Sequence, residues 1–386
     1  MKKYALFFLL FVLLQSQAFS QFSIGHRSLT WQDPARSNRD VPAEVYYPAT
    51  TAGENTSVMS GTFPVIVFGH GFMMSYSAYA FWKDNLVPIG YIMVFPTNEG
   101  GMSPDHGAYG ADLAFILNSM KSEGNNNASP FYQKIAATSA IAGHSMGGGA
   151  SFLACSNNSV PTCMFNFAAA ETTPSAITAA AAISIPSLVI SGADDCVAVP
   201  ADNQLPMFNA LASTCKSYIS INNGAHCYFA DYNFTCTVGE STCNPVPSIN
   251  RADQLDATLD VTVLFLDYFL KNQTSSWSAF TDSVSTSQRL TGTIDCSSAI
   301  VDRGISDGMS IYPNPATDRI NITTNLQAVT AIKIMNTTGA IFYESDAGSN
   351  LSNSNIGIDC SQWPRGIYLL KCTHAGISGF QKIVVE

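Results

Sequence analysis

Charged residues are scarce in this chain. Only 12% of the residues are charged, with 18 lysines and arginines against 28 aspartates and glutamates. No run of basic residues could follow a phosphate backbone, so we do not expect nucleic acid as a partner. The spacing of cysteine and histidine matches no zinc site, and we expect no cofactor. Serine, threonine, asparagine and alanine are abundant instead, a composition that suits an exported enzyme without identifying one.

Long apolar segments are also missing beyond the N-terminus. Two lysines at the start precede an apolar core, residues 5–14, that is too short to cross a bilayer. Small residues stand at the positions that determine cleavage, so we predict a signal peptide over residues 1–20 and a mature chain that starts near Gln21. An uncleaved anchor is the alternative. We therefore expect an exported protein that is soluble or held at a surface by other means.

The chain has ten cysteines, an even number that favours disulfides in an exported protein. The pairs suggested by spacing are Cys155–Cys163, Cys236–Cys243 and Cys360–Cys372, with Cys196 joined to either Cys227 or Cys215. Spacing does not decide which cysteines pair, and the sequence also allows one or two buried cysteines to remain free thiols.

Apolar strands alternate with helical stretches from Val41 to about Lys271. The runs with the length of buried strands are residues 64–70, 91–96, 140–144, 164–168, 187–191 and 218–221. Between them lie stretches with helical spacing, such as residues 110–120, and an apolar-faced helix over 255–270 closes the region. This alternation predicts an α/β fold with a mostly parallel central sheet covered by helices on both faces. We assign residues 21–298 to this domain.

The composition of the chain changes after Thr274. Residues 275–298 are rich in serine and threonine, and residues 299–308 have the glycines of a linker. Over residues 309–386, short alternating runs are separated by turn residues. They predict a small all-β sandwich, and because it holds no cluster of titratable residues we interpret it as an accessory module.

The most informative segment is Gly143-His144-Ser145-Met146-Gly147. It follows a short apolar run that predicts a buried strand, and it precedes small residues that can begin a helix, which is the context of a nucleophile elbow. Such a turn is so tight that Gly143 and Gly147 must lack side chains. Ser145 would stand at the head of a helix, where developing negative charge is stabilised. The alternative is a glycine-rich turn whose serine has no catalytic role.

A nucleophilic serine needs a base within hydrogen-bonding distance and an acid that orients the base. In folds of this kind the partners follow in the order serine, acid, histidine. His226 is the only histidine between Ser145 and the tail, and it follows one predicted strand, whereas Asp194 and Asp195 follow another. Since the carboxyl ends of parallel strands meet at one edge, we expect these groups near Ser145. His226 is the predicted base, and either aspartate is a candidate for the acid.

An oxyanion hole needs two backbone N–H donors. We predict Met146, which follows the nucleophile, and Phe72, which follows the first predicted strand and whose ring would line the acyl site. His70 precedes the nucleophile and is not expected to be the base. His144 is predicted to point away from the site in a structural role, and His106 to line the cleft.

Together these residues resemble the cutinase-like polyester hydrolases, which include the poly(ethylene terephthalate) hydrolases, in the dienelactone-hydrolase branch of the α/β-hydrolases. The resemblance covers about residues 41–271. Its most specific part is Gly-His-Ser-Met-Gly-Gly-Gly-Ala around Ser145, supported by His70-Gly-Phe and by Asn223-Gly-Ala-His226. It implies ester hydrolysis through an acyl-enzyme on Ser145. It also favours Asp195, because the acid of the family is followed by apolar residues and a proline.

The resemblance further implies which side chains contact the substrate. Phe72 and Met146 would bind the acyl group, and so would Glu171, which lies in the stretch Phe167-Ala-Ala-Ala-Glu171-Thr. The family often has a tryptophan in this stretch, and this chain has none. We therefore expect a polyester such as cutin or poly(ethylene terephthalate) as substrate. A lipase or carboxylesterase for small acyl esters is one alternative, and a non-catalytic surface adhesin on a hydrolase scaffold is another.

The tail resembles the C-terminal sorting domain of the type IX secretion system of Gram-negative bacteria. The matching segments are Ile311-Tyr-Pro-Asn-Pro-Ala, Gly366-Ile-Tyr-Leu-Leu-Lys and the terminal Lys382-Ile-Val-Val-Glu. This resemblance implies that the secretion machinery is a partner and that the protein is extracellular or on the outer cell surface. A substrate-binding module is the alternative for the tail, and we expect a monomer.

Overall fold

The computed structural model describes residues 21–244, 246–296, 309–324, 329–336, 339–345, 355–374 and 377–386. The chain divides into two units, Met1–Asp295 and Cys296–Glu386, which we call the large unit and the tail unit. The predicted signal peptide, residues 1–20, and the predicted linker, residues 299–308, lie outside the described residues.

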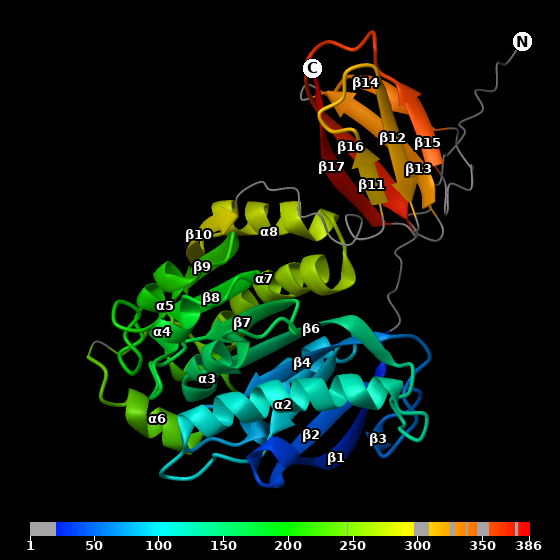
Figure 1. Cartoon of the computed structure of the whole chain (residues 1–386). Coiled ribbons are helices and arrows are strands. Elements are labelled where there is room, and N and C mark those ends of the chain that lie inside the picture. Colours follow the sequence, from blue (N-terminus) through cyan, green and yellow to red (C-terminus); the bar gives the residue numbers. More distant parts are fainter. Residues whose placement is uncertain are drawn as a thin grey trace, which may run out of the picture. The chain divides into compact units, whose positions relative to one another are not determined.

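The large unit is built around one ten-stranded sheet with the order β10-β9-β8-β7-β6-β4-β5-β2-β1-β3 (Figure 1). Its strands are β1 (Ser23–Asp33), β2 (Arg39–Ala49), β3 (Gly53–Glu54), β4 (Phe63–Gly69), β5 (Ile92–Pro96), β6 (Ile135–His144), β7 (Cys163–Phe167), β8 (Ser187–Gly192), β9 (Cys215–Ile221) and β10 (Leu290–Cys296). The strands from β5 to β9 in this order run parallel. Every residue of β4, β5, β7 and β8 is buried, which explains the continuous apolar runs. The predicted α/β fold is confirmed.

Helices cover both faces of this sheet (Figure 1). Over one face lie α2 (His106–Asn125), α3 (Met146–Cys155), α4 (Ala176–Ala180) and α5 (Gln204–Ala210), each in contact with the next, and over the other lie α7 (Arg251–Lys271) and α8 (Ser275–Thr286). The remaining helical segments are α1 (Ala80–Leu86), α6 (Phe234–Glu240), η1 (Pro34–Arg36), η2 (Tyr76–Tyr79) and η3 (Cys227–Phe229). Within the described ranges, no helix has both the length and the apolar character needed to cross a membrane.

Two parts of the large unit differ from the sequence-based picture. The long hairpin of β1 and β2 adds an antiparallel edge to the sheet. The serine- and threonine-rich segment after Thr274 forms α8 and β10. A few apolar anchors suffice for α8, because Phe280 is fully buried and the Trp277 ring stacks on it at 5.3 Å. The polar composition concealed these anchors.

The disulfide pairs suggested by spacing are wrong. Cys196 is bonded to Cys243 and Cys227 to Cys236. Cys215 and Cys296 are disulfide-bonded as well, whereas Cys155, Cys360 and Cys372 are buried thiols. A disulfide requires Cβ atoms about 4 Å apart, a condition of the folded structure and not of the sequence spacing. Here the loops after β8 and β9 meet because the two strands are neighbours.

The tail unit is a small sandwich of two antiparallel sheets. The first contains β11 (Met309–Tyr312), β12 (Arg319–Thr324) and β15 (Asn355–Asp359), and the second contains β14 (Ile341–Glu344), β13 (Val329–Asn336), β16 (Gly366–His374) and β17 (Ile377–Val385). Alternate residues such as Ile320, Ile322, Ile334 and Leu370 are fully buried between the sheets. The predicted all-β module is confirmed, and β15 is an addition to the strands expected from sequence.

Candidate active site

Ser145 lies at a sharp turn between β6 and α3. Its backbone has φ 54° and ψ −120°, a conformation that residues with side chains seldom adopt. A Cβ on Gly143 would lie 2.3 Å from the carbonyl oxygen of Gly147, and a Cβ on Gly147 would lie 2.2 Å from that of Gly69. The predicted need for glycine at both positions is confirmed. The turn places the Ser145 hydroxyl at the first turn of α3.

A methyl group at Gly147 should destabilise the large unit. Alanine is the better helix former by about 1 kcal/mol, so a net loss of stability reports the clash with the Gly69 carbonyl. We expect Gly147→Ala to lower the free energy of unfolding by about 3 kcal/mol, measured by urea denaturation. Gly101→Ala is the matched control, because a Cβ there would have no neighbour within 4 Å. Equal stability of the two variants would contradict this account of the turn.

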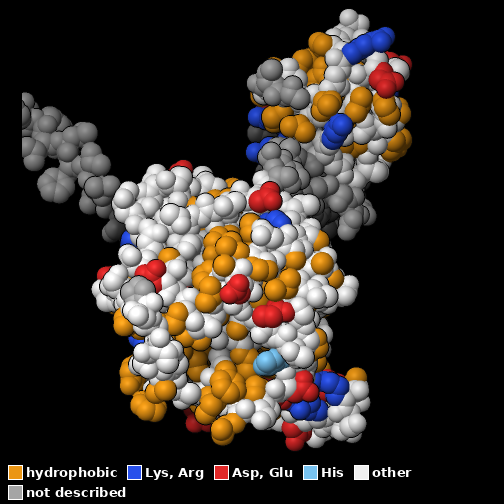
Figure 2. All heavy atoms as spheres, turned by 90° about the vertical axis from the view of Figure 1, so that its left-hand side faces the viewer, with side chains coloured by type: hydrophobic (Ala, Val, Ile, Leu, Met, Phe, Trp, Pro, Cys, Tyr) orange, Lys and Arg blue, Asp and Glu red, His pale blue; other side chains and the backbone are white. Residues whose placement is uncertain are grey.

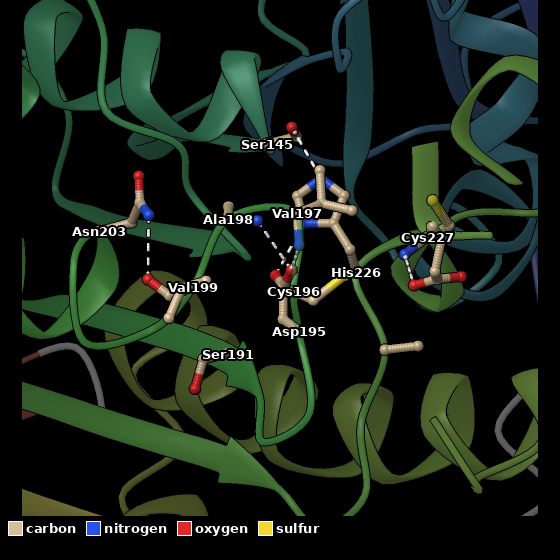
Figure 3. Close-up of polar contacts among 12 residues, drawn as sticks. Ser145, Ser191, Asp195, Cys196, Val197, Ala198, Val199, Asn203, His226 and Cys227 are labelled. Carbon is tan, nitrogen blue, oxygen red and sulfur yellow. Dashed lines mark hydrogen bonds and ion pairs between the residues drawn. The ribbon is translucent and has the colours of Figure 1, made fainter. Parts of the chain in front are cut away.

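The structure brings three of the predicted side chains into one chain of hydrogen bonds (Figure 3). His226 Nε2 lies 2.9 Å from Ser145 Oγ, and His226 Nδ1 lies 2.7 Å from Asp195 Oδ2. All three side chains are buried. Asp194, the other candidate, is exposed, and its backbone N–H donates to the carbonyl of Gly224. The carboxylate that reaches the imidazole is therefore that of Asp195.

The orientation of Asp195 is fixed by its own backbone surroundings. Its Oδ1 accepts the N–H groups of Val197 and Ala198, both at 2.8 Å, which leaves Oδ2 for His226 (Figure 3). A carboxylate accepts the proton on Nδ1, so the neutral ring presents Nε2 as an acceptor toward the Ser145 hydroxyl. This is the tautomer that a general base requires.

The loop that carries His226 is held by the start of α7. The fully buried Gln254 accepts the N–H of Ala225 at Oε1 and donates from Nε2 to the carbonyl of Ala225, both at 2.8 Å. Gln254 was not among the residues predicted from sequence, because it precedes the apolar spacing from which the helix was predicted. A glutamine on the buried side of a helix start is the signal that could have found it.

Two disulfides lie directly beside the acid and the base. Cys196 follows Asp195 and is bonded to Cys243, and Cys227 follows His226 and is bonded to Cys236. The segment from Cys227 to Cys243, including α6, is therefore anchored covalently at both positions. Glu240, buried on the same segment, accepts the backbone N–H of Cys227 at 3.0 Å.

His144 lies beneath the site and connects its loops. Its Nε2 donates to the carbonyl of His226 at 3.0 Å, and its Nδ1 accepts the hydroxyl of Tyr79 at 2.9 Å. That hydroxyl oxygen in turn accepts the N–H of Gly71 at 2.8 Å. Complete burial lowers the pKa of His144 well below its ordinary value, which keeps the ring neutral as this arrangement demands. His144 thus points away from the Ser145 hydroxyl, and the fully buried Tyr79 joins His144 to the loop at Gly71, a contact that was not predicted from sequence.

His70 is tied into the loop that precedes the pocket. Its ring nitrogens lie 3.0 Å from the carbonyl oxygen of Gly71 and 2.9 Å from that of Asn98. Burial lowers the pKa of this imidazole. These contacts place His70 in the support of the loop.

A pocket of about 390 Å³ opens above Ser145, within the range of small-molecule sites. Its lining residues are Phe72, Pro104, His106, Ser145, Met146, Ala170 and Glu171. Met146 is the first residue of α3, so its N–H has no acceptor within the helix. Among the described residues, the N–H of Phe72 donates to no acceptor either. Both N–H groups are thus available to a ligand.

Glu171 and His106 both line the pocket, Glu171 on the loop after β7 and His106 as the first residue of α2. The carboxylate of Glu171 accepts the N–H of Ile177 at 3.0 Å, and the Nδ1 of His106 accepts the N–H of Thr173 at 3.2 Å. Glu171 therefore supports the start of α4 as well as lining the pocket.

Two family models match the chain. The model described as PET hydrolase-like matches residues 20–243, more than half of the chain. The model described as a secretion system C-terminal sorting domain matches residues 310–386. The first match contains Ser145, Asp195 and His226, and the second corresponds to the tail unit.

Proposed function

The chain belongs to the PET hydrolase-like family, and from this premise we propose that it is a secreted serine esterase whose substrates are polyesters. Its tail unit is a type IX sorting domain, which indicates a secreted or outer-surface protein that interacts with that secretion machinery. The observation that carries the proposal is the hydrogen-bonded chain of Ser145, His226 and Asp195 at the floor of an open pocket.

Acylation begins with the hydroxyl of Ser145. His226 Nε2 takes its proton while Oγ attacks the ester carbonyl carbon, and Asp195 stabilises the imidazolium that forms. The backbone N–H groups of Phe72 and Met146 hold the oxyanion of the tetrahedral intermediate. As the intermediate collapses, His226 returns the proton to the departing alkoxide, and the acyl group stays on Ser145.

Deacylation repeats these roles with water as the nucleophile. His226 removes a proton from water, which attacks the acyl-enzyme carbonyl, and Ser145 Oγ leaves as it recovers the proton. Each proton and each electron pair is accounted for by groups of the chain, the ester and water, so the scheme needs no cofactor.

The lining of the pocket suits an apolar acyl group, such as the aromatic group of a polyester. Apolar side chains of Phe72, Pro104 and Met146 form much of its wall. In the stretch where the family often has a tryptophan, Ala170 and Glu171 line the pocket, and the small side chain of Ala170 leaves room there for a bulky acyl group. A lipase or carboxylesterase for small acyl esters is the alternative that uses the same chemistry.

Release of monomer from an amorphous poly(ethylene terephthalate) film tests the substrate class. We expect soluble aromatic products from the full chain and none from its Ser145→Ala variant. Hydrolysis of a chromogenic short-chain ester, measured alongside, reports the esterase chemistry alone. Cleavage of the short ester without release from the film would leave the small-ester alternative, and the absence of both activities would favour a non-catalytic adhesin.

A further inference from the structure

Large apolar side chains are exposed mainly at one edge of the large unit. Four loops follow the carboxyl ends of β4, β5, β8 and β9, and we call them the mouth loops: residues 70–75, 97–105, 193–203 and 222–250. They carry the exposed side chains of Phe72, Met73, Met102, Val197, Val199, Tyr232, Phe234, Val238 and Val246. Among the described residues of this unit, only Tyr132 and Val160 are exposed large hydrophobics elsewhere.

Sheet topology puts the mouth loops around the pocket. The carboxyl ends of parallel strands lie at the same edge, whereas Tyr132 and Val160 precede β6 and β7 and so lie at the opposite edge. Phe72 belongs both to the pocket lining and to the exposed set, which makes the two surfaces continuous. α6 lies at the left of the large unit in Figure 1, and Figure 2, viewed from that side, shows hydrophobic side chains gathered there.

The charge on the mouth loops limits what can bind there. They contain aspartates and glutamates but no lysine or arginine. A surface without cations has no attraction for anionic polymers or anionic lipids. Its apolar side chains gain instead from contact with an uncharged surface, because that contact removes them from water.

The most exposed aromatic residues of this edge lie outside the pocket lining, on a segment that is anchored by two disulfides. Tyr232 and Phe234 are 69 and 71% exposed, and they lie on the segment that the two disulfides attach beside Asp195 and His226. A partner that contacts Tyr232 and Phe234 is therefore held at a fixed position relative to the reacting groups. The apolar residues surround the pocket on several loops, an arrangement that fits an extended surface larger than one ligand.

We propose that the exposed apolar residues of the mouth loops form a docking face for the uncharged surface of an insoluble polyester. The proposal rests on the proposed function and adds the means by which a solid substrate is brought to Ser145. Chains at the polymer surface then enter the pocket next to Phe72, without a large movement of the enzyme.

Adsorption to amorphous poly(ethylene terephthalate) particles tests the docking face. The probe proteins are full chains with Ser145→Ala, so that the surface stays intact during the measurement. We expect the added pair Tyr232→Ser and Phe234→Ser to weaken adsorption about tenfold or more. Tyr132→Ser, at the opposite edge, is the matched control and should adsorb like the parent.

The same substitutions in the active chain separate docking from chemistry. We expect the Tyr232→Ser and Phe234→Ser pair to lower product release from film about tenfold while kcat/KM on a short soluble ester changes less than about twofold. The proposal would be overturned if the variant with Tyr232→Ser and Phe234→Ser adsorbed as well as its Ser145→Ala parent, or if Tyr132→Ser lost as much adsorption as that variant. A parallel loss on the soluble ester, or a parent dimer that the pair converts to a monomer, would also overturn it.

The outcomes also distinguish this inference from the proposed function. If the Ser145→Ala chain adsorbs through these residues but the active chain releases nothing from film, the docking face is supported and polyester hydrolysis is contradicted. If the active chain hydrolyses film equally well with and without the Tyr232→Ser and Phe234→Ser substitutions, polyester hydrolysis is supported and the docking face is contradicted.

Discussion

Replacement of Ser145 by alanine is expected to lower kcat on a soluble ester by about 10⁴-fold or more. The variant retains the pocket and both oxyanion donors, so binding and polarisation of the ester persist, but no covalent intermediate can form. The measurement is steady-state hydrolysis of a chromogenic short-chain ester by the full chain, with the wild type prepared in parallel.

Loss of folding is easily separated from this loss of chemistry. The substitution removes only a hydroxyl group and its hydrogen bond to His226, so it costs little stability. The thermal unfolding midpoint of the variant should therefore stay within a few degrees of the wild-type value. Activity within tenfold of wild type would show that another group is the nucleophile.

The two neighbouring aspartates should respond very differently to the same substitution. Asp195→Asn should reduce kcat about 10⁴-fold, because an amide at this position no longer selects the Nδ1-protonated tautomer or stabilises the imidazolium. Asp194→Asn should leave kcat within about twofold, because that carboxylate is exposed and the imidazole is held by Asp195.

This matched pair removes one negative charge at adjacent positions, so a general effect of net charge is the same in both. Steady-state kinetics on the short ester give the comparison directly. If Asp194→Asn were the more damaging change, the position of the acid in this structure would be incorrect.

Much of the site could be predicted from sequence because its signals are local. Gly143, Ser145 and Gly147 are predictable because a single tight turn requires this arrangement. Met146 is predictable because it directly follows Ser145. His226 could be identified because few histidines are present and the order of the partners is constrained. Asp195 and Asp194 could not be separated by residue type or strand ending, and the choice depended on a resemblance. The structure distinguishes them by the direction of one side chain.

The supporting contacts could not be predicted because they join distant parts of the chain. Gln254 holds Ala225 across 29 positions, and Tyr79 reaches His144 across 65. The Cys196–Cys243 bond depends on the neighbouring positions of β8 and β9. Residues such as Tyr79 and Gln254 have no pattern in sequence that separates a positioning role from ordinary core packing.

The long hairpin at the start of the large unit was missed for a related reason. β1 shows only partial burial along its length, since it lies near the edge of the sheet. Its alternation is correspondingly weak, whereas the central strands are buried on both faces and are plain in the sequence.

Covalent labelling with a fluorophosphonate is the most direct test of the central claim, that the Ser145 hydroxyl is activated by His226. The reagent reacts with a serine oxygen only where a base removes its proton, and the modified peptide is identified by mass spectrometry. We predict one label per chain, on the peptide that contains Ser145, with loss of esterase activity in proportion to labelling and little labelling of His226→Ala. Full esterase activity in a chain that is unlabelled at Ser145 after prolonged exposure, or labelling at another serine that abolishes activity, would contradict the account.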